Sequence, residues 1–161
     1  MSEELKCKVY DKNTLDDLKY VIVCSLYKDK LLLSRHKQRE TWETQGGHIE
    51  KGETPFQAAK RELYEESGVT DAELLYLCDY LGYTSKGHAN GAIFLAIVNE
   101  LGKLPESEMA EVKLFDLLPD NLTYPFVTPL IFKRTLQKYY DEQRRNELNK
   151  NKSSCSTDFD V

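Results

Sequence analysis

The chain has 161 residues, a length typical of one domain, and its 40% hydrophobic and 30% charged residues are ordinary for a globular protein. Its formal net charge of −5 argues against binding a nucleic-acid polymer by neutralising phosphates. The four cysteines lack Cys-x-x-Cys spacing, the first residues lack a hydrophobic run, and no apolar stretch approaches the ~18 residues of a membrane span. We therefore expect a cytoplasmic protein with reduced thiols, no secretory signal and no membrane contact.

The first predicted elements form a β-hairpin over residues 18–35. The continuous β-prone run at 20–27 is typical of a strand that is buried on both faces. The polar segment at 34–41 predicts a loop, and a short strand is predicted at 48–50, directly after two glycines.

A helix is predicted over residues 54–67, because both of its ends carry recognisable signals. Thr54 is suited to the N-cap, Pro55 to the first helical position, and Gln57 completes a capping box. Gly68 occupies the position of a left-handed C-terminal cap. Helical spacing predicts one apolar face made of Phe56, Ala59 and Leu63.

The second half of the chain predicts three more strands and one more helix. The strands are expected near 73–83, 91–99 and 111–116, with a loop at 85–90, and the helix from Thr128-Pro129 to about Leu148. The polar residues 150–161 predict a disordered tail after a domain at 1–149. Strands joined by hairpins and mixed with two helices predict an α+β fold with a mixed sheet.

Three glutamates, Glu62, Glu65 and Glu66, fall on one side of the first predicted helix at spacings i, i+3 and i+4. Like charges at i, i+4 cost on the order of a few tenths of a kcal/mol per pair unless a cation lies between them. One interpretation is a solvent-exposed acidic face, the commonest role of such charge runs. The other is a site for a hard cation, since carboxylate oxygens suit Mg²⁺ or Mn²⁺.

The surroundings of the glutamates favour the cation site. Gly46 and Gly47 allow the backbone to approach closely just before the helix. Arg61 can reach back to Glu53, and a bidentate pair between them would fix the intervening loop against the helix. One short segment would then present backbone carbonyls and a carboxylate face together.

The segment from Gly47 to Val69 also carries a specific pattern. It matches, without a gap, G-x5-E-x7-R-E-U-x-E-E-x-G-U with U an aliphatic residue, which is the signature of the Nudix hydrolases. The lead-in at 42–46 resembles the usual approach to that box, although Thr44-Gln45 stands where many members have an apolar residue and Pro. The resemblance implies a Nudix hydrolase domain over 1–149, with a mixed β-sheet sandwiched between α-helices.

The resemblance implies a metal site whose ligands lie in and around this box. Glu65 and Glu66 become ligands of Mg²⁺ or Mn²⁺, together with the carbonyl of Gly46. Glu62 becomes either a ligand or the base that activates water. Many members add an acid from a later loop. Glu106, Glu108 and Glu111 are the candidates and Glu108 is the choice by position, although a solvated loop acid is equally consistent with any one of them.

The implied reaction is the hydrolysis of a nucleoside diphosphate linked to another group X. Divalent cations are needed because an acidic site would otherwise repel the polyphosphate. Glu53 and Arg61 become the pair that shapes the catalytic loop. In size the chain is most similar to the MutT-like branch, which converts nucleoside triphosphates, oxidised ones included, to the monophosphate and pyrophosphate.

The identity of X stays open at this point. Absence of Pro between Pro55 and Pro105 disfavours ADP-ribose, and Val127 stands where an Asn often reads oxidised guanine in MutT-type enzymes. Nucleotide sugars or dinucleotides are alternatives, as is a nucleotide-sensing module without turnover, although all three helical glutamates are present. The expected partner is a small nucleotide, and a homodimer is left open.

Other residues near the box have two interpretations each. Trp42 and Tyr124 are suited either to stacking on a nucleobase or to packing, and His88 either to substrate contact or to an exposed loop. The basic residues at 35–39 are suited to phosphates or to an ordinary surface loop.

Overall fold

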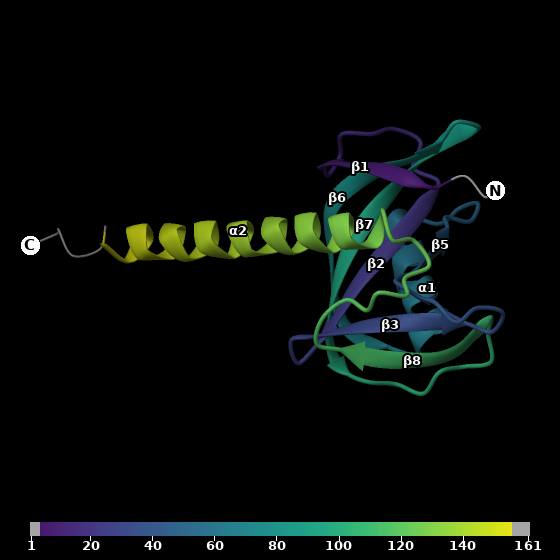
Figure 1. The fold of residues 1–161 in the computed structure, drawn as a ribbon. Coiled ribbons are helices and arrows are strands. Elements are labelled where there is room, and N and C mark those ends of the chain that lie inside the picture. The colour runs from purple at the N-terminus through teal and green to yellow at the C-terminus, as the bar shows by residue number, and fades with distance from the viewer. Residues whose placement is uncertain (1–3, 156–161) are drawn as a thin grey trace, which may run out of the picture.

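The computed structural model describes residues 4–155, and its centre is a β-sheet (Figure 1). Its strands are β1 (Lys6–Asp11), β2 (Tyr20–Tyr27), β3 (Lys30–His36), β4 (Trp42–Glu43), β5 (Gln45–His48), β6 (Asp71–Thr84), β7 (Gly87–Glu100) and β8 (Met109–Phe115). Their order is β1-β6-β7-β2-β3-β4, with β5 paired to β2 and β8 paired to β3. Because β2 and β7 are parallel and the other strand pairs are antiparallel, the sheet is mixed, as predicted.

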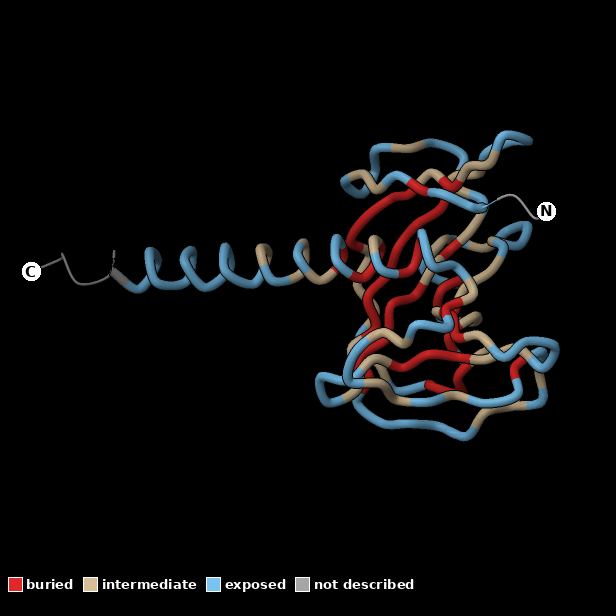
Figure 2. Tube along the Cα trace, viewed as in Figure 1, coloured by how far each residue is buried: buried red, intermediate tan, exposed pale blue. Residues whose placement is uncertain are grey.

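Two helices, α1 (Pro55–Ser67) and α2 (Thr128–Cys155), pack against different sides of this sheet. In the core beside α1, Val21 and Val23 of β2 lie with apolar residues of the helix. In the core beside α2, Cys24 and Leu26 of the same strand lie with the first turns of that helix. Alternate side chains of β2 therefore serve both cores, and the buried strands run through the middle of the molecule (Figure 2). The predicted α+β architecture is confirmed.

Both predicted ends of α1 are confirmed. The amide of Gln57 donates to the hydroxyl of Thr54 at 3.2 Å, and the amide of Thr54 donates to the side chain of Gln57 at 2.9 Å. Gly68 adopts the left-handed conformation, with φ of 79°, and its amide donates to the carbonyl of Tyr64. These caps fix where the acidic helix begins and ends.

The predicted apolar face of α1 is wrong at one position. Phe56 is 49% exposed, and Ala58 joins Ala59 and Leu63 in the buried face. Phe56 lies in the first turn, where the helix reaches the margin of the core, and its ring meets Phe94 edge-on with centroids 6.2 Å apart.

The helix α2 begins at Thr128 as predicted but continues to Cys155. Residues 150–155 are therefore helical, where the sequence predicted the start of a disordered tail, and 156–161 lie outside the described residues. The packed first turns provide the helix nucleus, so each further residue adds a hydrogen bond without a new nucleation cost. The second half extends away from the sheet and is largely exposed (Figure 2). Neither helix of the described chain combines the length and apolarity needed to cross a membrane.

The sequence prediction also missed or misplaced several strands. Neither β1 nor β4 was expected, and the short strand predicted at 48–50 lies at β5 instead. The loop predicted at 85–90 is mostly strand, because β6 and β7 stay paired up to Thr84 and Gly87. Polar residues with weak strand preference are held there by pairing with their neighbours.

Candidate active site

The predicted pair between Glu53 and Arg61 fixes the loop that leads into α1. The guanidinium of Arg61 donates through Nε to Glu53 Oε2 at 2.8 Å and through Nη2 to Oε1 at 2.9 Å. Nη2 also donates to the carbonyl of His48 at 2.9 Å, which ties β5 to the helix. The Arg61 bond, with a further bond from the amide of Glu50, lowers the pKa of Glu53 to about 2, so this carboxylate stays ionised.

Arg61 also contacts two of the three helical glutamates. Its Nη1 donates to Glu62 Oε1 at 2.8 Å and to Glu65 Oε2 at 3.4 Å. The side chain of Glu62 is only 12% exposed, and burial raises its pKa in spite of the guanidinium. A Cβ at Gly47 would lie 2.3 Å from Glu62 Oε1, so the glycine provides the space that this carboxylate occupies.

Glu66, like Glu62, is partly buried, whereas Glu65 is exposed. Glu66 Oε1 accepts a hydrogen bond from the amide of Gly46 at 2.7 Å. Burial, together with the charges of Glu62, Glu43 and Glu108, raises the pKa of Glu66 from 4.5 to about 8 against the lowering effect of the Gly46 bond. A carboxyl group in this environment takes up either a proton or a cation near neutral pH.

The chemistry of these donors fits a hard divalent cation. Among the described residues, no three His, Cys, Asp or Glu side chains are gathered into a metal-binding group. Instead Arg61 holds Glu62 and Glu65, while Gly46 holds Glu66. Burial and like charge nevertheless disfavour the ionised forms of Glu62 and Glu66, and a divalent cation is the kind of group that would offset both effects. Their assignment as metal ligands stays a prediction.

Two predicted ligands outside the helix also remain predictions. The contact that the structure gives Gly46 with the cluster is made by its amide, whereas the prediction concerns its carbonyl. The side chain of Glu108 is 84% exposed and lies 3.8 Å from the imidazole of His36. Its charge still raises the pKa of Glu66, which places it on the same side of the molecule as the cluster.

Sequence reasoning missed Glu43, a further carboxylate beside the cluster. Its side chain is 10% exposed, and it accepts hydrogen bonds from Arg39 Nη1 at 3.1 Å and from the hydroxyl of Thr123 at 2.7 Å. Its charge raises the pKa of Glu66. The sequence feature that could have identified Glu43 is its position three residues before Gly46, in the segment that leads to the two glycines.

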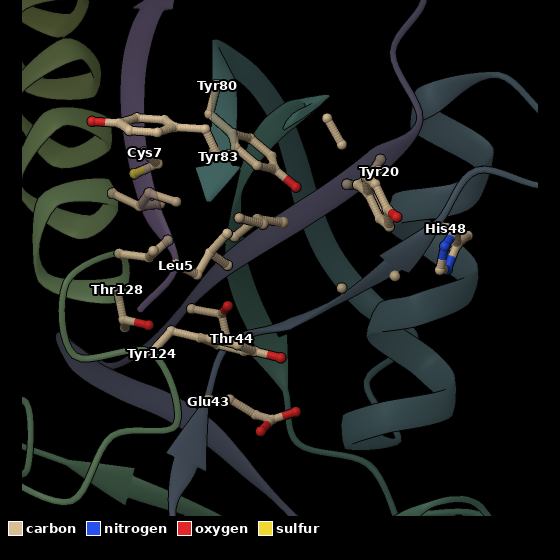
Figure 3. Close-up of a pocket in the computed structure, with 18 of the residues that line it drawn as sticks. Leu5, Cys7, Tyr20, Glu43, Thr44, His48, Tyr80, Tyr83, Tyr124 and Thr128 are labelled. Atoms are coloured by element: carbon tan, nitrogen blue, oxygen red, sulfur yellow. The ribbon is translucent and has the colours of Figure 1, made fainter. Parts of the chain in front are cut away.

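A cavity of about 500 Å³ opens next to Gly46 and Gly47 (Figure 3). One part of its wall is aromatic and apolar, and another is formed by Glu43, the two glycines and the backbone of β5. The apolar and aromatic lining includes Leu5, Cys7, Tyr20, Tyr80, Tyr83, Tyr124 and Ile131. The cavity therefore has an aromatic side suited to a flat ring and, next to it, the strand β5, in which the amide of Gly46 holds Glu66.

The aromatic and basic residues near the box divide between packing and the cavity. Trp42 is buried against Phe115, with ring centroids 5.0 Å apart, so its packing interpretation holds. Tyr124 and His88 line the cavity. The basic residues at 35–39 form ion pairs with acidic residues in and before β8. Arg35 pairs with Glu111 of β8, and Lys37 pairs with Glu106, which precedes that strand, at 3.1 Å each.

Comparison with known proteins identifies the family. A model of the NUDIX domain matches residues 18–122, which is more than half of the chain. The chain belongs to the NUDIX family. The matched part of this NUDIX protein contains α1 with its glutamates, the paired Glu53 and Arg61, and the strands that surround them.

Curated relatives of this NUDIX protein include enzymes named RNA pyrophosphohydrolase. The one from Mesorhizobium japonicum is 43% identical over 56 residues, which is 34% of this chain and 32% of the relative. The one from Brucella abortus is 45% identical over 53 residues, which is 32% of this chain and 30% of the relative. The match thus spans about a third of the length of these relatives.

Solved structures share the fold over most of their length. A pyrophosphohydrolase of Bacillus subtilis is 27% identical, with a TM-score of 0.68 covering 85% of this chain and 97% of that one. A UDP-X diphosphatase is 22% identical, with a TM-score of 0.63 over 81% of this chain and 68% of that one. The NUDIX domain of Shewanella oneidensis NrtR, complexed with ADP ribose, is 20% identical, with a TM-score of 0.58 over 86% and 94%. At these identities, the last two demonstrate a common fold.

Proposed function

We propose that this NUDIX protein hydrolyses phosphoric anhydride bonds and converts a nucleoside 5′-triphosphate to the monophosphate and pyrophosphate. The observation that carries the proposal is the place of Glu66, a partly buried carboxyl group among acidic neighbours that is hydrogen-bonded to a glycine lining the cavity. Family membership and the similarity to pyrophosphohydrolases support the reaction class.

The proposed activity requires Mg²⁺ or Mn²⁺. Glu62, Glu65 and Glu66 would hold the metal, with the carbonyl of Gly46 and the side chain of Glu108 as further ligands. When bound, a divalent ion neutralises phosphate charge and lowers the pKa of coordinated water. The raised pKa values of Glu62 and Glu66 support this assignment, because burial and neighbouring acids disfavour the ionised carboxylates and a divalent cation would offset both effects.

Side chains of the protein supply orientation and a base. Arg61 fixes the loop after β5 through Glu53 and keeps the Glu62 carboxylate against the helix. Glu62 is a candidate for the base that accepts a proton from water, because burial raises its pKa and Arg61 holds one of its oxygens. Its alternative role is that of a metal ligand.

The cavity supplies the binding surface for the nucleoside. Tyr80, Tyr83 and Tyr124 provide aromatic area for a nucleobase, and stacking on such side chains is worth about 1–3 kcal/mol per base. With its base against these tyrosines, a nucleotide would extend its phosphates towards Gly46 and Gly47, and so towards the glutamates of α1.

A second candidate substrate is the triphosphate at the 5′ end of an RNA. It is favoured by the printed names of the curated relatives, which are RNA pyrophosphohydrolases. The same reaction would then act on one end of a polymer, and binding would depend on the terminal nucleotide more than on the net negative protein surface.

A release assay for phosphate and pyrophosphate tests both candidates. The panel contains the common nucleoside triphosphates, oxidised dGTP, a nucleotide sugar, a dinucleoside polyphosphate, ADP-ribose and a short RNA with a 5′-triphosphate, each with Mg²⁺, Mn²⁺ or chelator. We expect metal-dependent release of pyrophosphate from a free triphosphate. Release of pyrophosphate from the RNA and from no free nucleotide would identify the 5′-triphosphate end of RNA as the substrate.

Other outcomes of this assay would overturn the proposal. Metal-dependent cleavage of the nucleotide sugar or dinucleotide, with triphosphates intact, would change X and retain the chemistry. No release from any compound by a folded protein that still binds nucleotide would indicate a sensing module.

A further inference from the structure

Gln45 is a polar side chain that is completely buried in the strand leading to the active site. It lies in β5, directly before Gly46, and has 0% exposure. Its Nε2 donates to the carbonyl of Leu32 at 3.2 Å and to the hydroxyl of Ser34 at 2.9 Å. Its Oε1 accepts from the hydroxyl of Ser25 at 2.7 Å. Both of its donors and its acceptor are therefore used inside the protein.

Ser34 carries the network onward to the acidic helix. Its hydroxyl is completely buried and donates to the backbone carbonyl of Glu66 at 2.7 Å. That carbonyl belongs to the last turn of α1, where carbonyl groups have no partner within the helix. Ser34 thus caps the end of α1 at the residue whose side chain enters the active site.

The contacts close into a circuit. Gln45 bonds to Ser34, Ser34 bonds to the backbone of Glu66, the Glu66 carboxylate accepts from Gly46, and Gly46 is covalently joined to Gln45. The circuit connects β5, β3 and the end of α1, which are brought together only by the fold. Glu66 is consequently held at its backbone carbonyl by Ser34 and at its carboxylate by Gly46, and Gln45 is joined to both of these residues.

We propose that Gln45 is a positioning residue, which sets the place of the Glu66 carboxylate relative to the Gly46 amide through Ser34. This inference rests on the proposed function, in which Glu66 is a metal ligand. Gln45 lies one peptide bond from Gly46, whose amide holds Glu66, and it acts through its neighbours. Loss of its bonds would let the end of α1 and β5 move independently, and supporting contacts of this kind commonly change metal affinity or activity by about 10–100-fold.

A purely structural role for Gln45 is the rival explanation, and Ser25 offers a matched control. Ser25 is completely buried and belongs to the same network. Its hydroxyl donates to the side-chain Oε1 of Gln45, so it lies outside the circuit that connects Gln45 with Glu66. Ser25→Ala and Ser34→Ala each remove one buried hydroxyl from Gln45. Only the second substitution breaks the path to Glu66.

The experiment compares wild type with Gln45→Met, Ser34→Ala and Ser25→Ala. The measured quantities are kcat and KM for the substrate found in the release assay, and the affinity for Mn²⁺ by calorimetry and electron paramagnetic resonance. Circular dichroism gives the folded fraction used to normalise each value. We expect Gln45→Met and Ser34→Ala to weaken Mn²⁺ binding and kcat by about tenfold, with KM for the nucleotide little changed. Ser25→Ala should stay within about twofold of wild type.

A double substitution tests the circuit itself. If Gln45 and Ser34 act along one path, the combined variant should lose little more than Gln45→Met alone, whereas independent effects would multiply to about a hundredfold. Equal losses in all three single variants, or unchanged Mn²⁺ affinity in folded Gln45→Met and Ser34→Ala, would overturn the positioning role. If Gln45→Met does not fold, Ser34→Ala against Ser25→Ala decides the question.

Failure of the proposed function is distinguishable from failure of this inference. A wild-type protein that binds Mn²⁺ but releases no product would refute the hydrolase. The ordering of Mn²⁺ affinities among the variants would still support or overturn the role of Gln45.

Discussion

Replacing Glu66 with Gln should stabilise the protein in chelator, and the gain should grow as the pH rises. The amide side chain keeps the oxygen that accepts from Gly46 and carries no charge at any pH. In wild type, the pKa of Glu66 is raised from 4.5 to about 8, mainly because the group is buried. The neutral acid is favoured in the fold, so the stability associated with it is complete below pH 4.5 and is lost as the pH rises through about 8.

The size of the effect follows from linkage between protonation and folding. Each unit of pKa difference corresponds to about 1.4 kcal/mol, so a shift from 4.5 to about 8 costs wild type roughly 3 kcal/mol at pH 7. Between pH 5 and pH 8, the difference in unfolding free energy between Glu66→Gln and wild type should widen by roughly 3 kcal/mol.

Urea denaturation followed by circular dichroism in chelator, at pH 5, 6.5 and 8, measures this difference. Glu65→Gln is the matched control, since Glu65 lies on the same helix and its side chain is 50% exposed. The control should follow wild type across the pH range, because burial does not oppose the charge of an exposed carboxylate. In the release assay, Glu66→Gln should lose turnover while remaining folded.

A pH-independent difference between Glu66→Gln and wild type would refute the electrostatic reasoning. So would a widening of the same size in Glu65→Gln, because it would show that helix charge as a whole, and not burial at Glu66, determines the pH dependence.

Four further predictions concern the site around Glu66. Arg61→Lys should lower kcat by at least about tenfold, because an ammonium group cannot replace the bidentate pair with Glu53, and steady-state kinetics on folded protein would show it. Gly47→Ala should displace the Glu62 carboxylate, which lies 2.3 Å from the new Cβ, and lower kcat by about tenfold with a change in unfolding free energy below about 1 kcal/mol. An unchanged kcat would contradict the role of Glu62. Tyr124→Ala should raise KM about tenfold with kcat retained, if the cavity holds the base. Mg²⁺ should raise the melting temperature of wild type more than that of Glu66→Gln, and equal shifts would place the cation elsewhere.

The parts of the site that could be predicted from sequence are those made by neighbours along the chain. Thr54 and Gln57 form a capping box across three residues, and Gly68 ends the same helix. Glu53 and Arg61 are eight residues apart, within one loop and two helical turns. Local spacing contains the geometry of such contacts, so the acidic helix and its supporting loop could be inferred before the structure.

The remaining parts depend on contacts between distant segments. Glu43 is held by Thr123, 80 residues further along the chain, and Gln45 is held by residues of two other strands. No local pattern distinguishes these side chains from ordinary surface polar residues. The strand β1 was missed for a similar reason, since it is a short edge strand stabilised by pairing with β6.

The distribution of charge around α1 distinguishes Glu66 from the other glutamates of the helix and fits its proposed role as a metal ligand. Arg61 carries a single positive charge and divides its donors among Glu53, Glu62 and Glu65. Within the part of the chain that the structure describes, the Glu66 carboxylate accepts a hydrogen bond from the neutral amide of Gly46 and lies among other acids. A second arginine beside Glu66 would stabilise the metal-free protein, but its guanidinium would compete with any metal for the carboxylate oxygens. The proposed metal would offset the free energy that the fold loses by burying the charge of Glu66, so its affinity would be linked to the instability of the metal-free protein.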